Sequence, residues 1–380
     1  MGRGSLDRMW RHSFVALIPA VLTACGMAYH ALAFVACLRF GRRKSAVAEA
    51  NLPVSILKPV RGRDPGFYDA IRSHALLEHP AGYEILFGLS DPDDPARHDI
   101  ARLQAEFPAL PIRVLPTTNQ APNGKAGSLE ILAAAAKYPV IVQNDSDIRV
   151  PPEYLQHVVG LLLTENTGLV TCLYRGYATS TAARMECLGI ATEFAPSVLV
   201  AEMLSASHFA FGSTLAMRAS DLQAIGGFAA VQNYLADDYQ IGARIAGLGR
   251  RVRLADMVVE TSMGSGSWSD VWKHQLRWTR TIRVSNPGGY LGYVVTHLTF
   301  WSLLAGLAGF PELALAGLIF RLFSASAAMK AIGLRTPVWQ VYLRDLFGAA
   351  VWACGVSGST VEWRGTRYRL TRDGHLKSNL

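Results

Sequence analysis

The sequence lacks the features of several common protein classes. Its five cysteines form no CxxC pair and no disulfide framework, so we expect them to be small buried hydrophobic residues. No serine or cysteine lies in a nucleophile motif, which argues against covalent catalysis. The middle of the chain has no basic stripe with interleaved aromatic residues, so a net charge of +8 does not indicate a nucleic-acid partner.

Charged residues are also scarce: they make up 17% of the 380 residues, whereas half of the chain is hydrophobic. The apolar residues are concentrated at both ends. Residues 14–38 are nearly all apolar and long enough to span a bilayer. This run continues well beyond Cys25, which favours an uncleaved anchor over a signal peptide or a lipoprotein signal. Basic residues flank both of its ends and favour a cytoplasmic location for the domain that follows.

Further candidate membrane spans lie at residues 290–310, 312–329 and 338–356. Arg321 interrupts the second and Arg344 the third. The basic tail at 361–369 should be cytoplasmic, so if the domain after the first span is cytoplasmic too, an even number of spans lies between that domain and the tail. One C-terminal segment is therefore expected to be re-entrant or interfacial, and the sequence leaves open which one. The expected location is a bacterial inner membrane, with several spans and a cytoplasmic catalytic domain.

Between residues 52 and 254, short apolar runs alternate with stretches of helical periodicity. This alternation is typical of an α/β domain with a largely parallel sheet. The expected helices lie near residues 66–78, 95–106 and 125–137. The expected strands lie at 54–57, 84–90, 112–115, 140–147, 168–173, 211–217 and 251–259.

Two carboxylates, Asp145 and Asp147, end the buried run that begins at Val140. In an extended chain this spacing places both side chains on one face, where they could share a divalent cation. Oxygen ligands suit Mg²⁺ or Mn²⁺. The alternative is an Asp-rich turn after a strand.

Neighbouring predicted strands end in polar residues too: Lys58 follows the first and Asp91 the second. Ligands of open α/β sheets bind outside the carboxyl ends of the strands, so these residues indicate a site for a metal-bound, phosphate-containing ligand. Lys125 opens the helix after the third strand, where its ammonium could meet a diphosphate. A solvated lysine in an ordinary turn is an equal alternative.

Three later stretches have two interpretations each. Asp237 and Asp238 open a helix, and the helix dipole alone would favour acids there. The tryptophans and arginines of residues 268–283 predict an interfacial amphipathic helix, or an anionic-ligand site. The apolar stretch 184–208 is either core or a surface helix that meets the membrane, and we favour the second.

Five motifs follow one another along the chain: Lys58-Pro59, Asp91 after a strand, Asp145-Ser146-Asp147, Asp238 after Gly-Gly-Phe, and His274-Gln275-Leu276-Arg277-Trp278. In this order they resemble the motifs of the processive-type GT-A glycosyltransferases. Within that group the sequence resembles the ceramide glucosyltransferases (glycosyltransferase family 21), including bacterial relatives that glycosylate hopanoid lipids. The resemblance implies a GT-A catalytic domain, Rossmann-like with a mostly parallel sheet, at residues 50–285. It also implies an anchor at 1–45 and membrane helices with a basic tail at 286–380.

The resemblance assigns roles to individual residues. Asp238 would be the general base, and Asp145 and Asp147 would hold the donor diphosphate through the metal. The nucleotide-sugar site would comprise Lys58, Asp91, Lys125, Asp145, Arg277 and Trp278, with Asp237, His274 and Gln275 in the acceptor motifs. The chain departs from the family where His274 replaces the usual Gln or Arg. It also lacks the histidine that eukaryotic ceramide enzymes carry in the segment matching residues 192–196.

The resemblance therefore predicts a membrane-bound, Mg²⁺- or Mn²⁺-dependent enzyme that transfers a hexose with inversion. The expected donor is UDP-glucose and the expected acceptor is the hydroxyl of a lipid such as ceramide. The alternatives are N-acetylglucosamine transfer to a hopanoid, a polysaccharide synthase-like transferase and a non-catalytic nucleotide-binding membrane protein. The sequence does not distinguish ceramide from hopanoid or diacylglycerol, and it does not indicate an oligomeric state.

Overall fold

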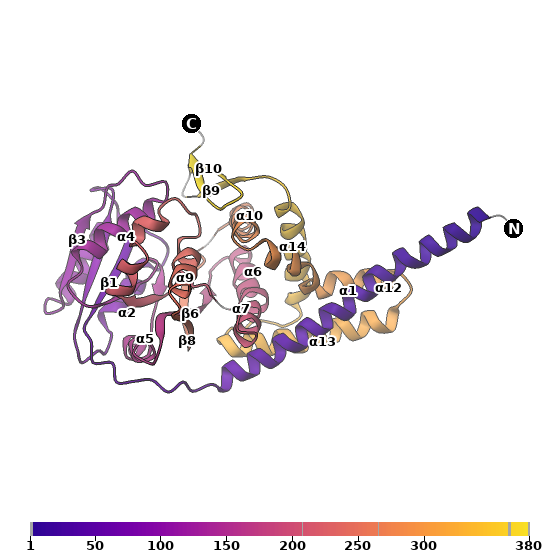
Figure 1. Ribbon diagram of the computed structural model, residues 1–380, viewed down its shortest axis with the longest axis horizontal. Coiled ribbons are helices and arrows are strands. Elements are labelled where there is room, and N and C mark those ends of the chain that lie inside the picture. The colour runs from indigo at the N-terminus through magenta and orange to yellow at the C-terminus, as the bar shows by residue number, and fades with distance from the viewer. Residues whose placement is uncertain (1–2, 207, 265, 364–365, 379–380) are drawn as a thin grey trace. The chain divides into compact units, whose positions relative to one another are not determined.

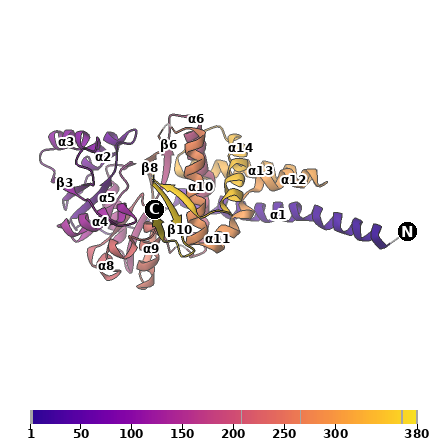
Figure 2. The same cartoon turned by 90° about the horizontal axis from the view of Figure 1, so that it is seen from above.

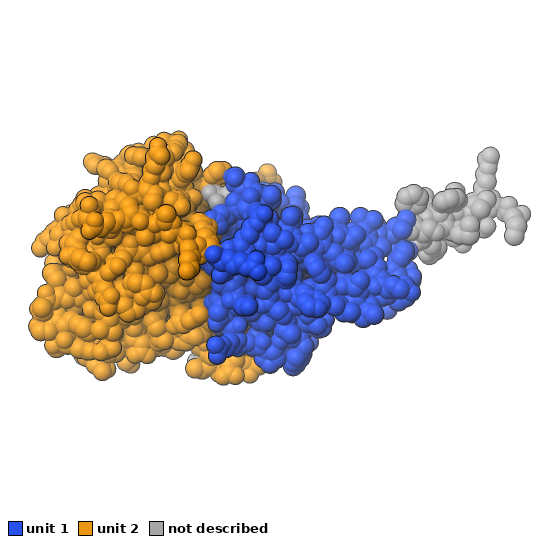
Figure 3. Space-filling model, turned by 90° about the horizontal axis from the view of Figure 1, so that it is seen from below, with its two compact units in different colours: residues 1–42, 185–205, 269–358 blue, residues 43–184, 206–268, 359–380 orange. Residues whose placement is uncertain are grey.

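The computed structural model describes residues 3–206, 208–264, 266–363 and 366–378. It contains two compact units, each assembled from separate stretches of the chain (Figure 3). Unit 1 comprises Met1–Arg42, Met185–Ser205 and Ser269–Gly358. Unit 2 comprises Arg43–Arg184, Ala206–Trp268 and Ser359–Leu380.

Unit 2 is built on a curled sheet that, within the described residues, has eight strands in the order β3-β2-β1-β4-β7-β6-β8-β5. The strands β3, β2, β1 and β4 run parallel, β7 is antiparallel to both of its neighbours, and β6 pairs in parallel with β8. The strands are β1 (Val54–Val60), β2 (Tyr83–Leu89), β3 (Ile112–Pro116), β4 (Val140–Gln143), β5 (Ile148–Arg149), β6 (Thr167–Tyr177), β7 (Leu215–Arg218) and β8 (Arg251–Ser262). This mostly parallel sheet confirms the predicted fold class.

Helices cover both faces of this sheet because successive side chains of its central strands are apolar on both sides (Figure 1). In β1, Ile56 belongs to one buried core and Leu57 to the other. The first core packs against α2 (Phe67–Ala75), α3 (Ala96–Glu106) and α5 (Tyr154–Leu162). The second packs against α4 (Gly124–Ala135), α8 (Ala219–Ala224) and α9 (Asp237–Gly247), with the short η2 (Phe228–Val231) beside them.

The predicted strand at 211–217 begins later than expected, since β7 starts at Leu215. Residues 211–214 instead form a tight turn in which the Thr214 amide donates to the Phe211 carbonyl at 3.0 Å. The fourth predicted strand likewise ends early, at Gln143. Both departures occur where the backbone leaves the sheet to contact polar side chains.

The described residues of the tail, which the sequence marked only as basic, form three antiparallel strands. These are β9 (Thr360–Trp363), β10 (Thr366–Leu370) and β11 (Leu376–Ser378). Val361, Leu370 and Leu376 are buried. This small sheet groups with unit 2.

Unit 1 is helical, and α1 (Arg3–Arg42) runs alongside α12 (Leu298–Leu307) and α13 (Pro311–Ile332) (Figures 1 and 2). Among the described residues, α1 from Val15 onward and α13 are long and apolar enough to cross a membrane. A third candidate is a bent pair, in which residues 287–296 and 298–307 meet at 50°. It contains α11 (Pro287–Gly292), η3 (Tyr293–Thr296) and α12.

The third predicted C-terminal span does not meet this test. It forms α14 (Gln340–Gly355), which has 16 residues and is shorter than a span requires. The sequence left open which C-terminal segment is not a span. By length and hydropathy it is the segment that contains Arg344, whereas α13 remains a candidate span despite Arg321.

Arg321 is accommodated in α13 because Asp345 of α14 neutralises it. Its Nε and Nη2 donate to the two carboxylate oxygens at 2.8 and 2.7 Å, and both side chains are at most 2% exposed. The Thr299 hydroxyl also donates to Asp345. A bidentate ion pair of this kind provides hydrogen-bond acceptors and a counter-charge for a buried guanidinium that apolar surroundings would otherwise destabilise.

Breaking this pair should destabilise unit 1. We expect Asp345→Ala to lower the free energy of unfolding by about 3–5 kcal/mol, because it leaves a buried, uncompensated cation. The measurement is the thermal midpoint of the detergent-solubilised protein. The double variant Arg321→Met/Asp345→Leu is the control and should recover most of the loss, whereas an unchanged midpoint in Asp345→Ala would contradict the assignment.

The stretch 184–208 is mainly core, so the favoured surface-helix interpretation is wrong. It contains the end of α6 (Thr181–Gly189), a π-helical turn at Ile190–Phe194 and α7 (Ala195–Met203). Most of its apolar side chains between residues 187 and 200 are buried, because the π-helical turn packs against α13 and α7 packs against α1, whereas Leu204 is exposed.

Candidate functional site

The register of the sheet brings three of the predicted site segments to the carboxyl ends of neighbouring strands. Leu57 of β1 pairs with Gln143, the last residue of β4, so Lys58 lies where β4 ends and the Asp145–Asp147 turn begins. On the other side of β1, β2 ends at Leu89, and Asp91 follows it. Asp91 is exposed, and its Oδ1 accepts from the Asp93 amide at 2.9 Å.

Asp145 is held by contacts from three elements. Its Oδ1 lies 2.6 Å from Lys125 Nζ of α4, and Gln143 Nε2 donates to the same oxygen at 3.3 Å. Its amide donates to the Gly212 carbonyl at 3.0 Å. The side chain of Asp145 is still 40% exposed, which leaves it accessible to a ligand.

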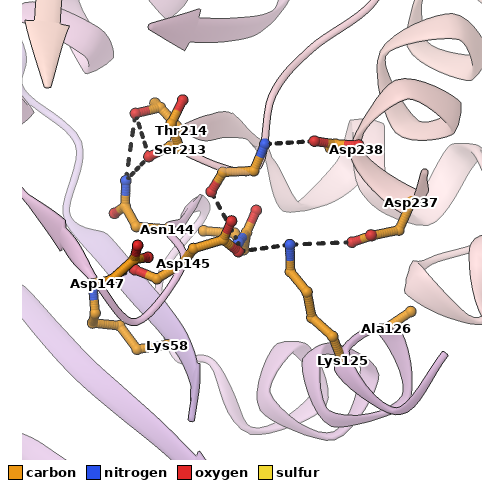
Figure 4. Close-up of polar contacts among 12 residues, drawn as sticks. Lys58, Lys125, Ala126, Asn144, Asp145, Asp147, Ser213, Thr214, Asp237 and Asp238 are labelled. Carbon is orange, nitrogen blue, oxygen red and sulfur yellow. Dashed lines mark hydrogen bonds and ion pairs between the residues drawn. The ribbon is translucent and has the colours of Figure 1, made fainter. Parts of the chain in front are cut away.

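Lys125 is not the solvated turn lysine of the alternative interpretation. Asn123 caps α4 by accepting from the Ala126 amide at 3.1 Å, which directs Lys125 between Asp145 and Asp237 (Figure 4). Burial lowers the pKa of Lys125, but the three nearby carboxylates raise it by more, so the net shift is upward. The ammonium therefore stays charged and links the two acidic segments.

The Asp145–Asp147 turn rests on a buried lysine. Lys58 is fully buried and donates to the Asp145 carbonyl at 3.1 Å and to His74 Nε2 at 3.3 Å. His74 can accept this bond because its Nδ1–H donates to the Ala70 carbonyl at 2.9 Å. Burial lowers the pKa of Lys58 to about 7, although Asp147 and Asp145 oppose the shift.

Asp147 lies beside Asp145 and accepts a hydrogen bond from the Thr261 hydroxyl at 2.6 Å. Burial, and then the charge of Asp145, raise the pKa of Asp147 to about 6. Asn144, which follows β4, donates to the Ser213 carbonyl at 2.6 Å (Figure 4). It also donates to the Tyr154 hydroxyl at 2.8 Å. The sequence analysis assigned no role to His74 or Asn144, because their hydrogen-bond partners are distant in the sequence.

The acid pair opens α9, as the helix-dipole interpretation requires, but it also makes long-range contacts. Asp238 Oδ2 accepts from the Gly212 amide at 2.7 Å, and its Oδ1 accepts from the Tyr239 amide at 2.8 Å. Burial and the neighbouring Asp237 raise the pKa of Asp238 to about 6, against the opposing effect of Lys125. A half-buried carboxylate with this pKa is suited to accept a proton near neutral pH.

Gly212 connects the two acidic segments, and the sequence analysis did not identify it. Its amide binds Asp238 and its carbonyl accepts from the Asp145 amide. A Cβ atom at this position would lie 2.7 Å from Asp145 Oδ2 and 2.9 Å from Lys125 Nζ. A methyl group at this position would therefore displace the carboxylate of Asp145 and the ammonium of Lys125 from their ion pair.

We therefore expect Gly212→Ala to reduce catalytic activity by roughly 100-fold, since displacing catalytic groups by about 1 Å has effects of that order. The measurement is the steady-state rate in membranes of matched expression. Gly247→Ala is the control, because a Cβ at Gly247 of α9 meets nothing within 4 Å. Equal activity in the two variants would contradict the proposed role of Gly212.

The residues of this site fit one divalent cation. The four carboxylates of Asp145, Asp147, Asp237 and Asp238 exceed the two ammonium groups of Lys58 and Lys125, which leaves a negative surplus. Among the described residues, no group of three or more His, Cys, Asp or Glu side chains could form a closed metal site. A site with one or two carboxylates suits Mg²⁺ or Mn²⁺ when substrate phosphates complete the coordination.

The remaining predicted residues, His274, Gln275, Arg277 and Trp278, lie in α10 (Trp268–Ser285), whose residues from Ser269 onward belong to unit 1. Within that unit, His274 Nδ1 lies 2.6 Å from Glu186 Oε1, and Gln275 Nε2 donates to the same oxygen at 2.7 Å. Burial raises the pKa of Glu186, but the hydrogen bonds from His274 and Gln275, together with electrostatic interactions with His274 and Arg344, outweigh burial and lower the net pKa. Glu186 thus fixes the start of the motif.

A second buried contact holds the same segment. Arg344 Nη2 donates to Gln275 Oε1 and to Glu193 Oε2, both at 2.9 Å. The Trp278 ring lies 4.8 Å from the His274 ring and 6.4 Å from the Phe194 ring. Arg344 thus connects α14 to the motif helix.

Comparison with known proteins gives consistent results. The chain is 21% identical to ceramide glucosyltransferase 1 of Caenorhabditis elegans, with 98% of this chain and 83% of the relative covered. It is 23% identical to ceramide glucosyltransferase 3 of the same organism, with 70% of this chain covered. It is 32% identical over 124 residues to the beta-monoglucosyldiacylglycerol synthase of Trichormus variabilis, which covers 32% of this chain. The chain spans 59% of the second relative and 26% of the third.

A solved structure has the same fold. The mannosyltransferase PcManGT from Pyrobaculum calidifontis, in complex with GDP-Man and Mn²⁺, superposes with a TM-score of 0.57 at 18% identity. The superposition covers 90% of this chain and 98% of the mannosyltransferase. The likeness confirms the predicted GT-A architecture of the chain.

The family model described as glycosyl transferase family 21 matches residues 18–376, which is nearly the whole chain. The match confirms the resemblance inferred from the strand-end acids and the motif of α10. The protein therefore belongs to glycosyl transferase family 21.

Proposed function

We propose that the protein is a membrane-bound glycosyltransferase that transfers a hexose from a UDP-sugar to the hydroxyl group of a lipid, with inversion at the anomeric carbon. The observation that carries the proposal is the junction at Gly212 and Lys125, which joins the Asp145–Asp147 turn to Asp238. A donor-binding turn and a proton acceptor are the two parts that a single displacement needs.

In this proposal Asp238 removes the proton of the acceptor hydroxyl. Its Oδ2 is oriented by the Gly212 amide, and its raised pKa makes it a better base than an exposed aspartate. Lys125 exchanges part of its contact with Asp145 for the donor phosphates. A divalent cation, held by Asp145 and Asp147, would neutralise charge on the departing UDP. Asp91 would contact the nucleotide, and Arg277 and Trp278 would contact the diphosphate and acceptor.

Two further features support a lipid acceptor. The chain has two helices, or three candidates with the bent pair, that could cross a membrane among its described residues. Relatives are named for ceramide and for glucosyldiacylglycerol. We propose glucose as the hexose because these relatives are named for glucosyl transfer. Ceramide and diacylglycerol are the first acceptors to test, and a hopanoid that accepts N-acetylglucosamine is the alternative.

The direct experiment is to incubate membranes that contain the protein with labelled UDP-glucose or UDP-N-acetylglucosamine, in Mn²⁺ or Mg²⁺, and to identify the lipid product by mass. A single glycolipid is the expected product. A polymer would identify a polysaccharide synthase instead, and nucleotide binding without transfer would identify a non-catalytic protein. Either result would contradict the proposal.

The pH dependence of the rate tests the base. Because the proposed base is active only when ionised, kcat should be nearly constant above pH 7 and fall below about pH 6, the pKa of Asp238. The decrease should approach tenfold per pH unit. The measurement is the initial rate of glycolipid formation at saturating donor from pH 4.5 to 8.5. A rate that rises toward acid pH would exclude Asp238 as the base.

A further inference from the structure

The C-terminal sheet contacts the loop at residues 232–236, which leads directly into α9. The Leu376 amide of β11 donates to the Asn233 carbonyl at 2.7 Å. Tyr234 and His375 form an antiparallel bridge, and their rings lie 4.3 Å apart between centroids. This sheet is therefore joined to the loop by both backbone and side-chain contacts.

The same loop is held from the other side by Asn123, the buried cap of α4. The backbone amide of Asn123 donates to the Gln232 carbonyl at 2.8 Å, and the side-chain Nδ2 of Asn123 donates to the Tyr234 carbonyl at 2.8 Å. Its Nδ2 also reaches Asp237 Oδ1 at 3.3 Å. Tyr234 is thus fixed through its carbonyl by Asn123 and through its ring by His375.

The turn that presents His375 is ordered by its own hydrogen bonds. The His375 amide donates to Thr371 Oγ1 at 2.9 Å, and the Thr371 amide donates to the His375 carbonyl at 3.0 Å. His375 Nδ1 lies 2.8 Å from Asp373 Oδ2. Gly374 has φ +84°, a conformation that favours glycine. A turn built in this way presents the imidazole in a defined direction.

We infer that His375, in the turn before β11, is a positioning residue for the acid pair Asp237–Asp238. This inference rests on the proposed function, because it assigns Asp238 to proton transfer. His375 orders Tyr234, Tyr234 orders the entry to α9, and that entry sets the distance between Asp238 and the Gly212 amide.

The inference predicts different effects on kcat and on the KM for the UDP-sugar. Asp145 and Asp147 follow β4, whereas the C-terminal sheet contacts the loop before α9. Loosening that loop should lower kcat and leave the KM for the UDP-sugar nearly unchanged. A general loss of folded protein would instead reduce the amount of active enzyme. It would leave the hydrogen–deuterium exchange of the loop amides unaltered in the protein that remains folded.

The test uses full-length variants in membranes. His375→Ala removes the ring contact with Tyr234, and we expect kcat to fall roughly tenfold with donor KM within about twofold. His375→Phe keeps an aromatic ring at this position and should restore most of kcat. Lys377→Ala is the control, because Lys377 is the exposed neighbour on β11 and should have wild-type kinetics. Wild-type kcat in His375→Ala, or no recovery in His375→Phe, would overturn the inference.

A physical measurement keeps this inference separate from the proposed function. Hydrogen–deuterium exchange of the amides in residues 232–236 should be faster in His375→Ala than in wild type, and unchanged in Lys377→Ala. If wild-type membranes form no glycolipid, the proposed function fails, while the exchange experiment still reports whether the sheet orders the loop. Unchanged exchange in His375→Ala would overturn the positioning role whatever the kinetics show.

Discussion

Asp238→Asn is expected to abolish glycolipid formation, with kcat reduced by about 10²–10⁴-fold, the usual contribution of a general base. The side-chain amide introduced by the substitution fills the same space and still accepts a hydrogen bond from the Gly212 backbone amide. It cannot take the proton from the hydroxyl group of the lipid. Donor binding should be retained because Asp145 and Asp147 are unchanged. The measurement is the single-turnover rate in membranes, together with UDP affinity of the purified protein.

The matched control is Asp221→Asn. Asp221 is a buried aspartate of α8, on the same side of the sheet as the half-buried Asp238, and it forms ion pairs with Arg218 and Arg250 at 3.6 and 3.5 Å. This variant should keep most of the transfer activity, although its stability should fall. Full activity in Asp238→Asn, or equal losses in both variants, would exclude Asp238 as the base.

The second large effect is expected for Asp145→Asn, which removes one of the two carboxylates proposed to hold the cation. Among the described residues, it also leaves Asp237, 3.5 Å away, as the remaining ion-pair partner of Lys125. We expect kcat/KM to fall by at least about 100-fold at a Mn²⁺ concentration that saturates wild type, because an uncoordinated donor diphosphate is a poor leaving group. The measurement is the rate as a function of Mn²⁺ concentration.

Chelation provides the control for this experiment. Wild-type activity should disappear in EDTA and return when Mn²⁺ or Mg²⁺ is added in excess, whereas Asp145→Asn should require a higher concentration for half-maximal rate. Asp147→Asn should likewise require a higher Mn²⁺ concentration for the half-maximal rate. Identical Mn²⁺ dependence in wild type and Asp145→Asn would show that the cation, if required, is held elsewhere.

Many elements of the fold were predictable because their signals are local. The buried runs of β1, β2 and β4 and the turns after them follow from strand periodicity and turn residues. The candidate spans α1 and α13 follow from length and hydropathy alone. The stretch 184–208 was misjudged because an apolar helix buried in a bundle and one facing lipid have similar compositions.

The partners of the site residues were not predictable. Glu186 and His274 are 88 residues apart, and Arg321 and Asp345 are 24 apart in different helices. Gly212 bonds to Asp238 across 26 residues. No periodicity connects such pairs, because their distance depends on how separate elements pack.

The sequence by itself determined which family the chain resembles and which residues are candidates for its chemistry, since short motifs specify residue types at the ends of predictable elements. Tertiary structure alone decided how these motifs act on one another. Lys125 is an ion-paired bridge and not a solvated lysine, and the basic tail is a sheet that contacts the entry to α9. The physical reason is that hydrogen bonds and ion pairs act over about 3 Å, a distance that only the packed backbone can set between remote segments.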